Sequence, residues 1–142
     1  MINDMSVLES TLTREKVLEE NKRVHKLEDK FYLDRHPEQI NFYQSRILRK
    51  AVDQVCSLMN TTRGDILELG CGTGYLYLEF LKRGHKITGV DLSSEMINVL
   101  KGRITKDCME RSKLVVSDVE TFADTDDKKY SAIILSALLH HL

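Results

Sequence analysis

A glycine-rich segment in the middle of the chain is the first candidate for chemistry. Gly70, Gly72 and Gly74 alternate with Cys71 and Thr73, and the apolar stretch 65–69 precedes them directly. Glycine permits positive φ and lets a backbone approach a ligand with no Cβ in the way. A helix that begins after such a run aims its free N–H groups and the positive end of its dipole at the same place. The spacing therefore predicts a strand, a ligand-binding turn and a helix.

An acidic residue follows at a distance typical of nucleotide-binding folds. Asp91 ends the apolar stretch 86–90, about 20 positions after Gly70. In doubly wound folds, a carboxylate at this place accepts hydrogen bonds from ribose hydroxyls. The same side chain could cap a helix over 93–105, and the two roles are compatible. Asp118 follows a third apolar stretch, and it is either a second ligand-binding acid or a solvated loop acid.

Two common nucleotide-binding loops do not fit this segment. The dinucleotide fingerprint needs a third glycine at position 75, and the chain has Tyr75 there. No Gly-Lys-Ser or Gly-Lys-Thr run follows the glycines, so the phosphate-binding P-loop is excluded as well.

The segments around the glycine run predict an α/β fold. Short apolar stretches alternate with helical patterns, which is typical of a parallel, doubly wound sheet with right-handed crossovers. Gly84 stands where a helix C-cap glycine belongs, and Ser93 or Ser94 is a suitable N-cap. We expect strands over 65–69, 86–90, 113–117 and 130–135, helices over 74–83 and 93–105, and a solvated loop over 124–129.

The first part of the chain is predicted to be helical. Apolar residues recur at helical spacing from about 37 to 59, where Asn60 and the turn to Gly64 end the pattern. Residues 1–36 carry a narrower apolar stripe among many charges. We therefore expect a helical arm or lid over 1–36 and one ligand-binding domain over 37–142.

Composition narrows the functional classes. The 142 residues are 42% hydrophobic and 30% charged, with a formal net charge of −1, so nothing points to a nucleic-acid or membrane surface. No apolar stretch approaches the roughly 18 residues that a membrane helix needs. Cys56, Cys71 and Cys108 are odd in number and far apart, which argues against disulfides and a metal site and favours a reducing cytoplasm.

Four segments together resemble the class I S-adenosylmethionine-dependent methyltransferases. The runs ELGCGTG at 68–74 and VDLSSEMI at 90–97 are similar to the first two motifs of that family. The match continues with SDVE at 117–120 and IILSALLHHL at 133–142. The last run is similar to small-molecule methyltransferases of the type that includes the ubiquinone and menaquinone biosynthesis enzymes. The resemblance covers roughly residues 40–142.

The resemblance implies a role for each matching position. Glu68 and the backbone of the glycine run would hold the methionine end of S-adenosylmethionine, and Asp91 would bind the ribose hydroxyls. The adenine would lie against apolar side chains and hydrogen-bond to Asp118. The implied cofactor-binding residues are Glu68, Gly70, Cys71, Gly72, Gly74, Asp91, Leu92, Met96, Asp118, Val119 and Ser136.

The resemblance implies a methyltransferase with a small-molecule acceptor. No Asp/Asn-Pro-Pro-aromatic motif follows the fourth predicted strand, which disfavours transfer to an exocyclic base nitrogen. His140 and His141 are candidates for a general base, and the alternative is a helix start beside the pocket. Cys71 could be a nucleophile or a small side chain that fills the turn, and the resemblance favours the second. The other functional hypothesis is a binding module that holds the nucleoside without turnover.

The sequence ends just after the fourth predicted strand, whereas family members continue through further strands. We therefore expect a shortened form of a longer protein. The strand 130–135 would then lie at an apolar sheet edge, which invites pairing with another chain. This predicts a homodimer or another edge-to-edge contact.

Overall fold

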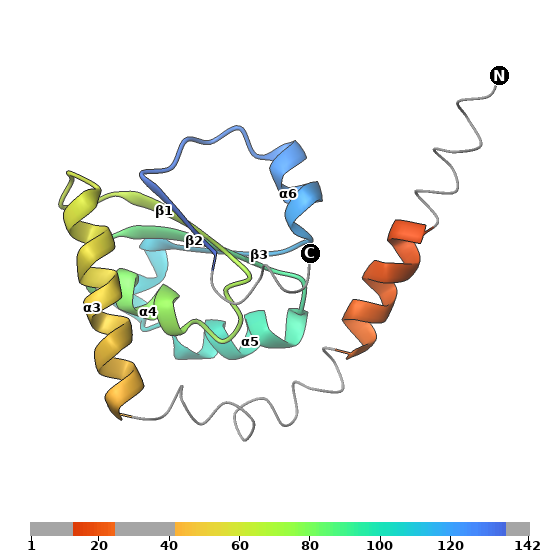
Figure 1. The fold of residues 1–142 in the computed structure, drawn as a ribbon, viewed down its shortest axis with the longest axis horizontal. Helices are drawn as coiled ribbons and strands as arrows, with labels where there is room; N and C mark the ends of the chain where they lie inside the picture. Colours follow the sequence, from red (N-terminus) through yellow and green to blue (C-terminus); the bar gives the residue numbers. More distant parts are fainter. Residues whose placement is uncertain (1–12, 25–41, 136–142) are drawn as a thin grey trace.

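The computed structural model describes residues 13–24 and 42–135, and it shows one parallel sheet with helices on both faces (Figure 1). The strands are β1 (Asp65–Leu69), β2 (Lys86–Asp91), β3 (Ser112–Val116) and β4 (Ala132–Leu135), in the order β3-β2-β1-β4. All three strand pairs are parallel, with Leu69 opposite Val90 and Leu135. The predicted α/β class and its parallel sheet are confirmed.

The helices follow the strands as expected, with shifted ends. They are α3 (Phe42–Leu58), α4 (Tyr75–Lys82) and α5 (Ser94–Arg103), with the 3-10 helix η3 (Lys106–Arg111) before β3. Asn60 adopts a left-handed φ of 54° after α3, and Gly84 does so at 90° after α4. Both residues therefore end helices as predicted. Residues 37–41, where the first of these helices was expected to begin, lie outside the described residues.

The sequence predicted neither η3 nor the helix that follows β3. Helix α6 (Val119–Thr125) follows β3, and Asp118 is its N-cap. It takes in Asp124 and Thr125 from the segment 124–129, which was expected to be loop throughout. Its only buried side chain is that of Phe122. Seven residues with one buried position are too few to display a helical period.

Each face of the sheet has its own apolar core. Ile66 and Ile87 pack with α3, α4 and α5 on one face, whereas Leu67 and Val90 pack with Phe122 of α6 on the other. Alternate residues of a strand point to opposite faces, so neighbouring positions enter different cores. Figure 1 shows α6 on the side of the sheet opposite α4 and α5. Both faces of the central strands are covered, as expected for a parallel sheet.

The helix 13–24 contacts the start of α6. Arg14 lies 2.9 Å from the Asp118 carboxylate and 2.7 Å from that of Glu120. The expected boundary of an N-terminal arm at residue 36 lies outside the described residues and stays a prediction. No helix of the described ranges is long and apolar enough to cross a bilayer.

Strand β4 lies at the edge of the sheet, as expected. Ile133 and Leu135 of this strand are 57% and 45% exposed. They lie on the face of the sheet that α6 covers over the central strands. An apolar edge of this kind is open to pairing with another strand. The homodimer expected from it stays a prediction.

A buried histidine ties the amino ends of two strands together. His85 is 3% exposed, and its Nδ1 accepts the Gly64 N–H at 3.0 Å, while Nε2 lies 3.3 Å from the Cys56 sulfur. An accepting Nδ1 places the proton of the neutral ring on Nε2. Burial, and then the charges of Arg83 and Arg111, hold the pKa of His85 below its usual value.

Acidification should therefore destabilise the chain through His85. Above about pH 6.5 the ring is neutral in both states, so its contribution to stability is fully present. Below that pH the unfolded chain takes up a proton that the folded chain resists, and the free energy of unfolding falls until the lowered folded-state pKa is passed. We expect urea unfolding between pH 7 and 5 to show this loss. His85→Gln, which keeps an acceptor for Gly64, should flatten the profile, and an unchanged slope would contradict the assignment.

Candidate functional site

The glycine run forms a tight turn over the carboxyl end of β2. Gly70, Gly72 and Gly74 have φ values of 71°, 50° and 88°, all in the left-handed region. The N–H groups of Gly70 and Cys71 both donate to the Val90 carbonyl, at 2.8 and 3.1 Å. The conformation of the turn therefore requires glycine at all three positions, because other residues rarely adopt positive φ.

The carboxylate of Asp91 joins this turn to the start of α5. Its Oδ2 accepts the Gly72 N–H at 2.7 Å, and its Oδ1 accepts the Ser93 N–H at 2.9 Å. Ser93, and not Asp91, is the N-cap of α5, since its hydroxyl accepts the Met96 N–H. Each carboxylate oxygen has a second acceptor position left for a ligand. Asp91 can thus shape the turn and bind a hydroxyl at once.

The middle of the turn is open, and its end is closed. A Cβ on Gly72 would have no heavy atom of the described residues within 4 Å, whereas one on Gly74 would collide with the Leu100 side chain of α5. Between them, the buried hydroxyl of Thr73 has no hydrogen-bond partner among the described residues. An open backbone beside an unsatisfied buried hydroxyl fits a polar ligand, because such a hydroxyl costs free energy until it is paired.

The side chains of Cys71 and Glu68 face the core beneath the turn. Cys71 is 4% exposed, and its sulfur would lie 2.9 Å from a Cβ on Gly89. Burial, followed by the charges of Glu68 and Asp91, raises the pKa of the Cys71 thiol far above its ordinary value. A protonated, buried thiol is a poor nucleophile. Glu68 is also buried, with 1% of its surface exposed.

Asp118 and Val119 lie at the end of β3, next to Asp91. The Ser117 N–H donates to the Asp91 carbonyl at 3.0 Å, which links the two strand ends. Burial raises the pKa of Asp118, but hydrogen bonds from Thr121 and the charge of Arg14 outweigh it and hold the pKa below its usual value. Asp118 is therefore an ionised helix cap that is already engaged, and not a solvated loop acid.

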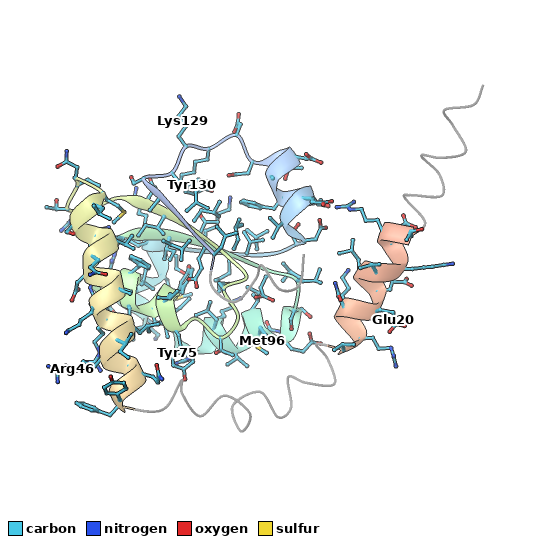
Figure 2. All side chains as sticks on the ribbon, in the orientation of Figure 1. Glu20, Arg46, Tyr75, Met96, Lys129 and Tyr130 are labelled. Atoms are coloured by element: carbon cyan, nitrogen blue, oxygen red, sulfur yellow. The ribbon has the colours of Figure 1, made fainter. Side chains whose placement is uncertain are left out.

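Of the remaining residues that the sequence suggested for the site, two lie in the described part of the chain and three lie outside it. Leu92 is half-buried beside Asp91. Met96 of α5, which is labelled in Figure 2, is 5% exposed. Ser136, His140 and His141 lie outside the described residues, and their roles stay predictions. Within the described ranges, no group of three or more His, Cys, Asp or Glu side chains could hold a metal ion.

Two polar contacts of the site could not be predicted from the sequence. Arg103 of α5 donates to the Thr73 carbonyl at 2.7 Å, and Arg14 reaches Asp118. Both contacts join residues that are far apart in the chain, and neither arginine belongs to a local motif. Only the fold places them at the turn and at the start of α6.

The match to a protein family agrees with this geometry. A family model described as a methyltransferase domain matches residues 66–142, which is more than half of the chain. The chain belongs to this family of methyltransferase domains.

Curated relatives carry methyltransferase names. The malonyl-(acyl-carrier protein) O-methyltransferase of Priestia megaterium is 35% identical over 96 residues, which are 66% of this chain and 33% of that protein. The ubiquinone biosynthesis O-methyltransferase of Alkalilimnicola ehrlichii is 30% identical over 77 residues, 54% of this chain and 31% of that protein. The chain thus spans about a third of the length of these relatives.

Solved structures share the fold. Magnesium protoporphyrin IX methyltransferase of Synechocystis PCC 6803, with bound SAM, superposes with a TM-score of 0.56 at 19% identity, covering 72% of this chain and 51% of that one. The glycopeptide N-methyltransferase MtfA, complexed with S-adenosylhomocysteine, has a TM-score of 0.54 at 26% identity, covering 61% and 37%.

Proposed function

We propose that this chain binds S-adenosylmethionine and is the cofactor-binding part of a methyltransferase with a small-molecule acceptor. The observation that carries the proposal is the Asp91 carboxylate, which holds the open Gly72 backbone at the carboxyl end of the sheet. Ligands of open α/β sheets bind at this end. The names of the relatives, which include O-methyltransferases, support a methyl group as the group that is transferred.

The proposed binding residues form three groups, one for each part of the ligand. The backbone of the glycine turn, with Glu68 beneath it, holds the methionine end. Asp91 binds the ribose hydroxyls with its remaining acceptor positions, and Leu92 and Met96 border the adenine. Asp118 accepts from the adenine amino group beside Val119. Ser136 completes the proposed set at the methionine end.

The chemistry asks little of the protein beyond positioning. The sulfonium of S-adenosylmethionine supplies a methyl group that is already activated. The chain holds that group in line with the acceptor and excludes other geometries. A base such as His140 or His141 is needed only where the acceptor must lose a proton.

Calorimetric titration tests the proposed ligand. We expect heat of binding with S-adenosylmethionine and with S-adenosylhomocysteine, and none with NAD, because Tyr75 replaces the glycine of the dinucleotide fingerprint. A folded sample that gives no heat with either adenosyl ligand would refute the proposal. Methyl transfer to candidate acceptors then distinguishes an enzyme from a module that only holds the nucleoside.

Replacing Gly72 with alanine should weaken binding far more than it weakens the fold. The new Cβ meets no heavy atom in the described part of the chain but stands where the ligand approaches, so we expect at least about a tenfold loss of affinity for S-adenosylhomocysteine. The left-handed φ of 50° costs alanine about 1 kcal/mol of stability.

Gly84→Ala is the matched control for this variant. Gly84 has a φ of 90° after the other end of α4, so alanine there brings similar strain far from the turn. We expect comparable destabilisation with unchanged affinity. Equal affinities of the two variants would show that no ligand approaches Gly72.

The proposal also includes the location of the chain in the cell and its assembly. We place the chain in the cytoplasm, which its three free cysteines support. We also propose a homodimer through the β4 edge, supported by the exposed Ile133 and Leu135. Light scattering of a purified sample tests the dimer, and Ile133→Lys should convert it to a monomer. A monomeric parent chain would refute this assembly.

A further inference from the structure

One peptide group of the glycine turn is held from both sides. The Thr73 carbonyl accepts from Nη1 of Arg103 at 2.7 Å, and the Gly74 N–H donates to the Cys71 carbonyl at 2.9 Å. The C=O and N–H of a trans peptide point in opposite directions. The two bonds together therefore fix the plane of the Thr73–Gly74 peptide.

Arg103 is itself held in place at the turn. It is the last residue of α5, and its guanidinium lies 5.0 Å from the centre of the Tyr75 ring. Stacking on an aromatic face restricts the long side chain and leaves its donors directed at the carbonyl. The contact with Tyr75 thus orients Arg103 for the bond to Thr73.

This peptide leads directly into α4. Gly74 is the N-cap of α4 and gives it no side-chain cap, so the free N–H groups of the first turn of α4 face the glycine turn and attract a carboxylate. Without Arg103 the Thr73 carbonyl loses its donor, and among the described residues only the bond from the Gly74 N–H to the Cys71 carbonyl still holds this peptide.

We propose that Arg103 is a positioning residue for the amino-acid end of the adenosyl ligand, acting through the Thr73–Gly74 peptide. The inference rests on the proposed function. Arg103 fixes this peptide and so keeps the free N–H groups at the start of α4 directed at the ligand carboxylate. The adenosine end of the ligand lies against Asp91 and α6, and it is unaffected by this peptide.

Two ligands separate this role from a merely structural one. S-adenosylhomocysteine has the amino-acid end, whereas 5′-methylthioadenosine lacks it. For Arg103→Gln we expect about a tenfold loss of affinity for the first and less than about a twofold loss for the second. Arg103→Lys, which keeps the charge and a donor, should recover part of the loss.

Arg111 provides the matched control. Its Nη1 donates to the Leu81 carbonyl at 2.8 Å, at the opposite end of α4. Arg111→Gln removes a bond of the same kind and should leave both affinities unchanged. Calorimetry on the whole chain and its variants gives all these values, and thermal unfolding shows that each variant is folded.

The outcomes decide between the two proposals. Equal losses for both ligands, or no loss with S-adenosylhomocysteine, would overturn the role of Arg103 and leave the proposed function standing. A parent chain that binds neither ligand would overturn the proposed function and this inference with it.

Discussion

Alanine at position 74 should destabilise the chain by about 3 kcal/mol, which combines the cost of a left-handed alanine with that of an overpacked core. Gly74 has a φ of 88°, and its Cβ would collide with Leu100, a fully buried side chain of α5. Either the buried Leu100 side chain or the turn must shift to relieve the contact. Thermal unfolding should show a decrease in Tm of about 10 °C, given the size of the chain.

Gly102→Ala is the control for this substitution. Gly102 lies in α5 near Leu100, but among residues 13–24 and 42–135 a Cβ there meets nothing within 4 Å. Alanine in a helix is favoured over glycine by about 0.5–1 kcal/mol, so this variant should be slightly more stable than the parent. A Gly74→Ala chain as stable as the parent would show that the turn does not pack on α5 as described.

Asp91→Asn should reduce the affinity for S-adenosylhomocysteine about 100-fold. The carboxylate accepts from both Gly72 and Ser93, and an amide can accept from only one of them. The other N–H then faces an amide donor, and the charge that strengthens hydrogen bonds to ribose hydroxyls is lost. Equilibrium titration of the folded variant measures the effect.

A ligand without the 2′-hydroxyl separates the two causes of this loss. The parent should bind 2′-deoxy-S-adenosylhomocysteine more weakly than the natural ligand, whereas Asp91→Asn should discriminate little between them. Asp65→Asn changes the same charge at the amino end of β1, where Asp65 pairs with Lys128 at 3.2 Å, and should leave both affinities unchanged. Undiminished discrimination by Asp91→Asn would remove the ribose assignment.

The central elements of the fold could be predicted because their signals are local. The run 65–69 carries Ile66, Leu67 and Leu69 and is followed directly by glycine, and the structure has β1 at Asp65–Leu69. Gly84 and Ser93 mark helix ends through their own conformational and hydrogen-bonding properties. The glycine turn with Asp91 could be predicted for the same reason, since both features directly follow strands.

The remaining features depend on packing between distant segments. Helix α6 has one buried side chain, Phe122, so its sequence carries no period. The sequence places Cys71 in the turn, but the direction of its side chain is fixed by the space that Gly89 leaves on β2. The bond from Arg103 to Thr73 exists only because α5 crosses beside the turn.

The central claim is that the glycine turn and the acids at the strand ends hold an adenosyl ligand. A ¹⁵N–¹H correlation spectrum, recorded as S-adenosylhomocysteine is added, tests it residue by residue. We expect the largest shifts at the amides of Gly72, Thr73, Leu92 and Val119, with small changes at Gly64 and His85 at the amino ends of the strands. Saturation without shifts at the first four amides, or shifts confined to the amino ends, would contradict the account.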